Sequence, residues 1–217
     1  MALNASSQDY LRALWKLNEW KKEPVSPSAL GKALGLSPST ITQGVRKLAG
    51  LGLVSHERYG AISLTDEGRA EAARMVRIHR ILETGLVQLL GYSWDEVHDE
   101  AERLEHAVSD LFIERLDERL GYPACDPHGD TIPRDDVPGS LLTLMDMREG
   151  EEAAIQRILD HESVLHDADR LGLRPGIALR LHKKSETFLT VHHPPMKDTF
   201  TIPCAVASCI AVEIAGR

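Results

Sequence analysis

Apolar residues recur at helical spacing near the start of the chain, with charged residues between them. A first helix is expected over about residues 7–20, with an apolar face of Tyr10, Leu11, Leu14, Trp15 and Leu17. A serine followed by a proline then occurs twice, at Ser26 and at Ser37, and each pair is a helix start signal. Gly35 between them suits a left-handed turn. Residues 26–50 are therefore predicted to form a helix-turn-helix.

Two short runs of alternating hydrophobicity follow at residues 53–65 and predict a β-hairpin. A helix, a helix-turn-helix and a hairpin in this order are typical of a winged helix-turn-helix, whose second short helix enters a major groove of DNA. A winged fold that binds only other proteins is the alternative at this point.

If the head binds DNA, polar side chains at the start of its second short helix face the bases. These are Ser37, Ser39, Thr40 and Gln43, of which Gln43 can pair with adenine through two hydrogen bonds. Arg46, Lys47 and the hairpin residue Arg58 are assigned to phosphates, which supply affinity but little sequence choice. An ordinary solvated role remains open for each of them.

A long helix is predicted over about residues 65–90, with Ala70, Ala73, Val76, Ile81, Leu82, Leu86 and Leu89 on its apolar side. A capping box at Ser93 and Glu96 predicts a second helix that runs to about residue 107, and a third helix is expected over residues 109–120. Such helices behind a DNA-binding head indicate a dimerisation segment, because a two-fold reader needs two heads at a fixed spacing.

Proline and glycine are frequent over residues 121–140, which are interpreted as an irregular linker. Beyond it, a helix is expected at residues 162–171, and alternating strands are expected at 177–184, 187–193, 199–203 and 209–214. These elements fit a five-stranded barrel of the SH3 type. The predicted fold class is mainly α with a small β domain, divided into a DNA-binding head (1–72), a helical dimerisation and metal-binding domain with its linker (73–140) and an SH3-like domain (141–217).

Composition narrows the class of protein. Apolar residues make up 42% and charged residues 27%, which excludes general disorder. Three cysteines without a CxxC pair argue against a disulfide framework and against a zinc ribbon. A targeting signal and a membrane-length apolar run are not found, so a cytoplasmic protein without a membrane partner is expected.

The net charge of −8 is unevenly distributed. Residues 1–70 hold nine basic against six acidic side chains, residues 71–140 hold seven against sixteen, and residues 141–217 hold nine against eleven. A mildly basic head followed by an acidic middle segment indicates that the head binds an anion and that the middle segment binds cations. Chance and solvated helix faces are the alternative explanation.

Within the acidic middle, imidazole and carboxylate side chains share one stripe of a predicted helix. Its members are His98, Glu102, Glu105 and His106, at offsets of 0, 4, 7 and 8 residues. His79 and Glu83 are likewise four residues apart on the preceding helix. Six such groups on two neighbouring helices favour a site for divalent metal ions over a solvated face or packed histidines.

The chain resembles the diphtheria toxin repressor family of metal-dependent transcriptional regulators, and within it the manganese-responsive branch with a C-terminal SH3-like domain of the FeoA type. The resemblance covers nearly the whole chain and rests on LSPSTITQGVRKL in the head, on RIHRILE around His79, and above all on VHDEAERLEHAVSD from residue 97 to residue 110. It implies a homodimer that binds double-stranded operator DNA and represses metal-uptake genes when its ion is abundant.

The resemblance also implies two metal sites. The ancillary site falls on His79, Glu83 and His98, and the primary site falls on Asp9, Glu102, Glu105 and His106. Iron-responsive members have a cysteine at the position of Glu102, whereas this chain has a carboxylate and no sulfur in the set. Harder oxygen ligands favour Mn²⁺, with Fe²⁺ as the alternative and Co²⁺ or Zn²⁺ as substitutes in vitro.

Arg12 departs from manganese sensors that lack a third domain, which carry a carboxylate at its position. This difference favours two separate metal sites over one closely spaced two-metal centre. The third domain is expected to add an oxygen ligand to the ancillary site, from Asp160 or, as the alternate, from Glu162. His128, His192, His193 and Cys125 are expected to pack in loops or at the surface.

Two other functions remain as alternatives at this point. A metal-dependent hydrolase or oxygenase would use the His/Glu cluster as an open catalytic centre, but no substrate pocket or nucleophile-orienting group is evident in the sequence. A winged-helix regulator of an organic effector would leave the His/Glu stripe unexplained. The expected function is a metal-activated repressor that is not an enzyme and has no organic substrate.

Overall fold

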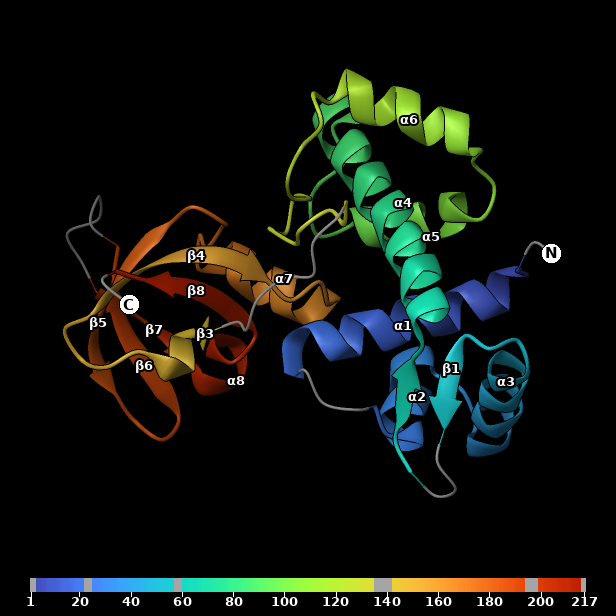
Figure 1. Cartoon of the computed structure of the whole chain (residues 1–217). Helices are drawn as coiled ribbons and strands as arrows, with labels where there is room; N and C mark the ends of the chain where they lie inside the picture. The colour runs from blue at the N-terminus through green and yellow to red at the C-terminus, as the bar shows by residue number, and fades with distance from the viewer. Residues whose placement is uncertain (1–2, 22–24, 57–59, 135–141, 194–198, 216–217) are drawn as a thin grey trace.

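The computed structural model describes residues 3–21, 25–56, 60–134, 142–193 and 199–215. Figure 1 shows an N-terminal head and a group of helices around one long helix, with a β-domain beside them. The first helix, α1 (Ala5–Lys21), lies between the rest of the head and the upper helices α4 (Asp66–Leu90), α5 (Val97–Glu105) and α6 (Asp110–Arg119). The C-terminal end of α1 points toward the β-domain. The fold class expected from the sequence, mainly α with a small β domain, is confirmed.

The head is a winged helix-turn-helix. Its elements are α1 (Ala5–Lys21), α2 (Pro27–Leu34), α3 (Pro38–Gly50), β1 (Val54–His56) and β2 (Ile62–Leu64). The Ser26 hydroxyl accepts a hydrogen bond from the N–H of Ala29, and Ser37 caps α3 in the same way. Gly35 ends α2 at φ 63°, a conformation that glycine adopts without steric cost.

Three helices follow the head: α4 (Asp66–Leu90), α5 (Val97–Glu105) and α6 (Asp110–Arg119). Thr65 and Gly91 cap α4, which agrees with the helix predicted over about residues 65–90. The prediction of a helix that starts from a capping box at Ser93 is wrong, because α5 begins only at Val97. The Glu96 carboxylate accepts a bond from the N–H of Ser93 at 3.3 Å, but it does so across a turn that precedes the helix.

The β-domain is an antiparallel sheet with the order β3-β8-β4-β5-β6-β7. Its elements are β3 (Leu142–Thr143), the 3₁₀ turn η1 (Leu144–Asp146), β4 (Glu152–Ile158), α7 (Glu162–Arg170), β5 (Ala178–Lys184), β6 (Phe188–His192), β7 (Thr199–Pro203), α8 (Cys204–Ala207) and β8 (Ile210–Ile214). The SH3-like class agrees with the prediction, but the sheet has six strands instead of five and β3 and β7 are its edges. The sequence places only four of these strands by residue range; the two that it does not place are β4 and β3, which is only two residues long.

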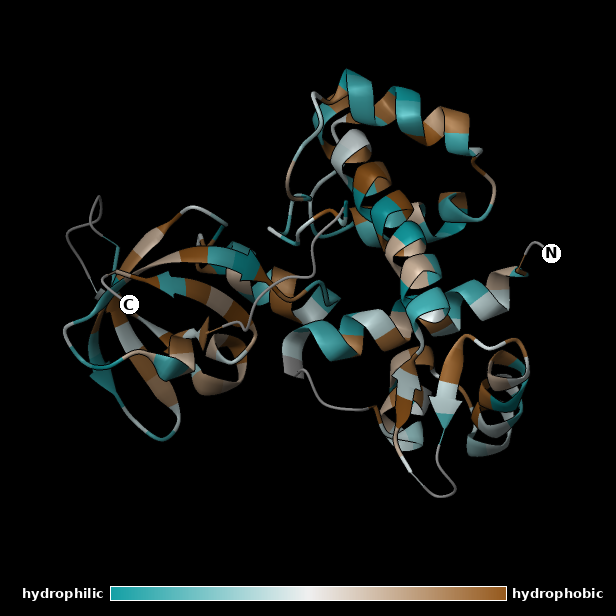
Figure 2. Ribbon diagram, in the orientation of Figure 1, coloured by the Kyte–Doolittle hydropathy of each residue, from teal (hydrophilic) through white to brown (hydrophobic). Residues whose placement is uncertain are grey.

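Among the described residues, buried hydrophobic side chains form three cores, and Figure 2 shows brown, hydrophobic segments in each of the three regions. The head core forms around Leu11 and Val45, and the core of the upper helices forms around Ile81 and Val97. The β-domain core includes Trp94, which comes from the α4–α5 connection and is 8% exposed. The β-domain is therefore packed onto the helices through a shared aromatic side chain. Among the described residues, no helix combines the length and apolarity needed to cross a bilayer.

The segment after α6 is more ordered than the predicted linker. The Asp126 carboxylate accepts hydrogen bonds from the N–H groups of His128 and Asp130 at 2.8 and 2.9 Å, which closes a buried turn. Gly129 in this turn has φ 86°, and a Cβ there would lie 2.0 Å from the carbonyl oxygen of Gln156 in β4. The turn at residues 126–130 can therefore sit directly against β4, which fixes how the β-domain meets the helices.

Candidate metal centre

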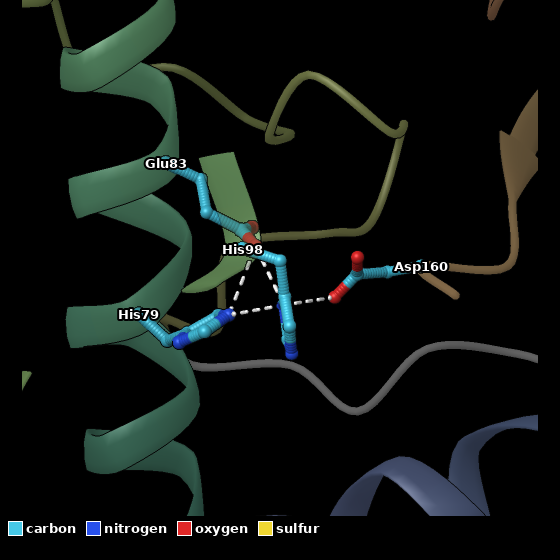
Figure 3. A group of neighbouring side chains, drawn as sticks. All are labelled: His79, Glu83, His98 and Asp160. Carbon is cyan, nitrogen blue, oxygen red and sulfur yellow. Dashed lines mark hydrogen bonds and ion pairs between the residues drawn. The ribbon is translucent and has the colours of Figure 1, made fainter. Parts of the chain in front are cut away.

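The metal-ligating side chains gather where α1, α4, α5 and the β-domain meet. His79 and Glu83 lie one turn apart on the inner face of α4 because residues i and i+4 share a helix face. Each of these two side chains is 1% exposed. His98 reaches the same place from the first turn of α5, and Asp160 enters from the β4–α7 connection (Figure 3).

These four side chains form the buried cluster, defined as His79, Glu83, His98 and Asp160. Glu83 Oε1 lies 2.9 Å from His79 Nε2 and 3.2 Å from His98 Nδ1. Asp160 Oδ2 lies 2.8 Å from the same Nδ1 atom (Figure 3). One potential ligand atom of each residue falls within 4.8 Å of the others. The three residues of the predicted ancillary set are brought together, and Asp160 joins them in preference to Glu162, which is exposed on the first turn of α7.

The carboxylates of the buried cluster are held as anions by their neighbours. Burial alone would raise the pKa of Asp160, but the Lys16 ammonium, 2.7 Å from Asp160 Oδ2, outweighs it and holds the pKa below its usual range. Burial likewise acts to raise the pKa of Glu83, yet His79 brings it well below the ordinary value. Against the opposing effect of burial, hydrogen bonds to Asp160 and Glu83 raise the pKa of His98 to about 9.

A second group, the open cluster, consists of Asp9, Glu105 and His106. Asp9 lies on α1, Glu105 is the last residue of α5, and His106 follows it. His106 Nε2 lies 2.9 Å from Asp9 Oδ1 and 3.4 Å from Glu105 Oε1. The side chains of Asp9 and His106 are 36% and 24% exposed and line a cleft of about 620 Å³, whereas that of Glu105 is fully buried. Burial raises the pKa of Asp9 against the opposing charge of His106.

Glu102 does not join the open cluster in this structure, which departs from the predicted primary set. Its carboxylate forms an ion pair with the Arg12 guanidinium, which also lies 3.4 Å from Glu105 Oε1 and 2.9 Å from His79 Nδ1. Burial acts to raise the pKa of Glu102, but Arg12 outweighs it and lowers the pKa. Arg12 thus supplies positive charge between the two clusters.

His79 connects the two clusters. Its Nε2 atom faces Glu83 and His98, and its Nδ1 atom lies 2.6 Å from Glu105 Oε2. A carboxylate on the far nitrogen of a ligating histidine fixes the tautomer and the orientation of the ring. The position of the Glu105 side chain and the donor properties of His79 are therefore coupled.

A third group, which sequence reasoning missed, contains Glu83, Asp126 and His128, all buried. His128 packs in a loop, one of the two predicted alternatives, but it is fully buried and does not lie at the surface. Glu83 outweighs the effect of burial and raises the pKa of His128 to about 10. Burial first, then Asp130 and Glu83, raises the pKa of Asp126 well above its ordinary value.

The donor chemistry fits hard and borderline divalent cations. The clusters offer carboxylate oxygens and imidazole nitrogens without sulfur, the ligand types that suit Mn²⁺, Fe²⁺ and Zn²⁺. Glu105 Oε1 is buried and has no hydrogen-bond partner among the described residues, so an acceptor is already aimed into the open cluster.

The polar positions proposed to read DNA are exposed on α3. They are Ser37, Ser39, Thr40, Gln43, Arg46 and Lys47. The Ser37 hydroxyl is engaged with Ser39 and Thr40, while Lys47 donates to Asn4 and Ser7 at 3.1 Å and so ties α3 to α1. Arg58 lies outside the described residues.

Family models match two adjoining parts of the chain. The N-terminal DNA-binding domain of iron-dependent repressors matches residues 2–62. The metal-binding and dimerisation domain of the same proteins matches residues 65–134. Both matches agree with the winged head and with the helices that carry His79 and Glu105.

Relatives of established type align over most of the chain. The iron-dependent repressor IdeR of Mycobacterium tuberculosis is 35% identical over 96% of both chains. The diphtheria toxin repressor of Corynebacterium efficiens is 29% identical over 81% of this chain and 80% of its own length. Among solved structures, a manganese-dependent transcriptional repressor in complex with manganese aligns with a TM-score of 0.89, 42% identity and coverage of 95% of this chain and 98% of that one. The manganese regulator SloR aligns with a TM-score of 0.82, 32% identity and coverage of 98% and 99%.

Proposed function

The chain belongs to the family of iron-dependent repressors, so it is a metal-dependent, DNA-binding transcriptional repressor and not an enzyme, and we propose that manganese is the ion that activates it. The observation that carries this proposal is the donor set. Oxygen and nitrogen ligands from the head, the helices and the β-domain converge in two linked clusters without a sulfur atom. Such ligands favour Mn²⁺ over softer ions.

The buried cluster is the proposed ancillary site, held by His79, Glu83, His98 and Asp160. The open cluster is the core of the proposed primary site, with Asp9, Glu105 and His106 as ligands. We assign Glu102 to the primary site as well, which requires its carboxylate to exchange Arg12 for the ion. This exchange is feasible because the Glu102 side chain is 48% exposed and borders the same cleft.

The proposed mechanism is a clasp between the head and the helices. Asp9 projects from α1 of the head, while Glu105 and His106 belong to the α5 region, so one ion bound by them adds a bond between two elements. Neutralised carboxylates no longer repel one another, and α1 becomes fixed against α5. Because Lys47 hydrogen-bonds the first turn of α1, the position of α1 also governs the recognition helix α3. Two heads held at one distance can then match successive major grooves.

Asp160 extends the clasp to the β-domain. It reaches Lys16 on α1 and His98 on α5 with the same carboxylate oxygen, so the β-domain is docked on both the head and the helices. Filling the buried cluster would stiffen this docking. A coupling of roughly 1–3 kcal/mol between sites is sufficient for a useful switch.

The dimer proposed for this repressor uses the upper helices. Leu89, Leu90, Leu111 and Phe112 are 46–69% exposed at the end of α4 and the start of α6. Apolar side chains of this size are characteristic of surfaces that pack against a partner. We treat residues 1–72, 73–140 and 141–217 as the DNA-binding, dimerisation and SH3-like domains, with double-stranded operator DNA and a second copy of the chain as partners.

A titration of operator affinity against free Mn²⁺ and free Fe²⁺ at equal ionic strength tests the proposal. Mn²⁺ is expected to raise the affinity at lower free concentration than Fe²⁺, and a strong chelator is expected to remove the effect. Equal binding in chelator would refute metal activation. Activation by Fe²⁺ at the lower concentration would support the iron-dependent alternative.

The substitution Glu102→Cys tests the basis of the metal preference. A thiolate in place of the carboxylate is expected to shift activation toward Fe²⁺, Co²⁺ or Zn²⁺, because softer ligands select softer ions. Glu100→Cys, on the same helix but outside the clusters, is the matched control. An unchanged metal profile for Glu102→Cys would remove Glu102 from the primary site.

A further inference from the structure

The buried turn after α6 presents an acceptor that the two proposed metal sites do not use. His128 Nε2 lies 2.6 Å from the carbonyl oxygen of Trp94, a distance at which the nitrogen must carry the proton and donate it. The other nitrogen, Nδ1, is free of this bond and can bind a metal ion that displaces its proton. Nδ1 is buried and has no hydrogen-bond partner within the described part of the chain.

Carboxylates surround this nitrogen. His128 Nδ1 lies 3.7 Å from Glu83 Oε2 and 3.9 Å from Asp126 Oδ1, both too far for a hydrogen bond. In the metal-free protein the proton on the His128 ring supplies the positive charge among these groups, and a divalent ion would take its place. A histidine that donates one N–H to a backbone carbonyl and directs its other nitrogen toward carboxylates is in the arrangement that orients metal ligands.

We propose that Glu83, Asp126 and His128 form a third binding site for a divalent metal ion, adjacent to the buried cluster and sharing Glu83 with it. Glu83 Oε1 belongs to the buried cluster and Glu83 Oε2 faces the third site, so the carboxylate bridges the two. The inference rests on the proposed metal activation, because Glu83 is common to both sites.

The spacing of the donors suits a small divalent ion. Bonds of about 2.1 Å place two donors roughly 3 Å apart at right angles and roughly 4.2 Å apart on opposite sides of an ion. The observed 3.7 and 3.9 Å fall between these limits. Two carboxylates and one imidazole match the donor preference of Mn²⁺ or Fe²⁺.

An ion in the third site would lock the turn to α4. The same turn supports the β-domain, because the N–H of Ile158 donates to the carbonyl oxygen of His128 at 2.9 Å and Gly129 sits against Gln156. The third site would therefore stabilise the docking of the β-domain.

The test is a count of Mn²⁺ bound per protomer of the full-length protein after equilibrium dialysis, in the wild type and in His128→Phe. Phenylalanine keeps a ring against Trp94, whose centroid is 5.7 Å from that of His128, but it offers no ligand. The variant is expected to bind one ion fewer than the wild type. His166→Ala, which removes an exposed imidazole, is expected to lose none. An unchanged count for His128→Phe would overturn the third site.

A second variant and a diffraction measurement protect the test from a folding defect. In His128→Gln the side-chain amide can still donate to the Trp94 carbonyl, and the same loss of one ion is expected if the variant retains the wild-type circular dichroism. In crystals of the Mn²⁺-loaded wild type, anomalous scattering at the manganese edge is expected to show a peak beside His128 Nδ1. Peaks at the buried and open clusters without one at His128 would overturn the third site alone. A wild-type protein that binds no Mn²⁺ would overturn the proposed function as well.

Discussion

The buried and open clusters are made of the same side-chain types but differ in how they are closed. In the buried cluster, Glu83 and Asp160 already contact two imidazoles and the Lys16 ammonium, so its members stay together without an ion. In the open cluster, His106 lies 2.9 Å from Asp9 and 2.8 Å from Gln8, both on α1, and the side chains of His106 and Asp9 are partly exposed. An ion is therefore expected to change the relative position of the elements little at the buried cluster and more at the open cluster.

This difference separates a structural site from a regulatory one. Elements that are already tied together gain rigidity from a ligand but change position little, whereas a weak contact between independently packed elements can be switched. The direct link through His79 means that the two sites are not independent.

Removing the imidazole of the open cluster is expected to have the largest effect. His106→Ala deletes the one side chain that contacts both Asp9 and Glu105, so the clasp cannot close. Operator affinity at saturating Mn²⁺ is expected to fall by about 100-fold, near the upper end of typical allosteric coupling. Fluorescence anisotropy with labelled operator DNA measures it. A His106→Ala protein that retains wild-type affinity would end the regulatory assignment.

The equivalent change in the buried cluster is expected to lower operator affinity less. His79→Ala removes a ligand from a site whose other members remain held by Lys16 and by one another, and a loss of about 10-fold in Mn²⁺-dependent operator affinity is expected. The same anisotropy titration applies, with His166→Ala as the control. If His79→Ala proves more damaging than His106→Ala, the roles of the two clusters are exchanged.

Neutralising Arg12 is expected to strengthen metal binding at the open cluster. Arg12→Gln removes a positive charge that pairs with Glu102 and faces Glu105, so the carboxylates of the open cluster attract a cation more strongly. Removing about 1 kcal/mol of repulsion between the Arg12 guanidinium and the bound ion corresponds to roughly a fivefold gain in Mn²⁺ affinity. Isothermal titration calorimetry measures it. Arg12→Lys, which keeps the charge, should show a smaller gain, and equal affinity in both variants would contradict this role for Arg12.

The smallest expected effect is that of pH on the stability of the metal-free protein. The folded-state pKa of His98, about 9, lies above its ordinary 6.5, because Asp160 and Glu83 accept hydrogen bonds from the ring against the effect of burial. The stability that comes from this proton is full below pH 6.5 and is lost as the pH rises through about 9.

The thermal unfolding midpoint in chelator is the readout for this effect. It should fall between pH 6.5 and 9, by about 2–4 °C for each kcal/mol lost. His98→Gln should show a smaller fall, the remainder coming from His128, whose pKa is also raised. A midpoint that rises with pH, or an equal fall in His98→Gln, would contradict the assignment.

Much of the fold follows from local signals in the sequence. The Ser-Pro starts of α2 and α3 and the Thr65 and Gly91 caps of α4 each act within one turn, so their consequences do not depend on distant parts of the chain. The false start at Ser93 shows the limit of this reasoning. Trp94 lies in the turn at residues 94–96 and is buried in the β-domain core, and α5 begins only after this turn.

The sequence by itself determined the helices and the ligand pairs within them, because a four-residue spacing places two side chains on one helix face wherever the helix lies. Tertiary structure alone decided that Glu102 faces Arg12, that Asp160 rather than Glu162 enters the buried cluster, and that His128 lies against Glu83. These contacts join residues 45 to 90 positions apart, and two of them involve irregular segments without periodicity. Their geometry depends on how separately formed elements pack, and a spacing along the chain carries no information about that packing.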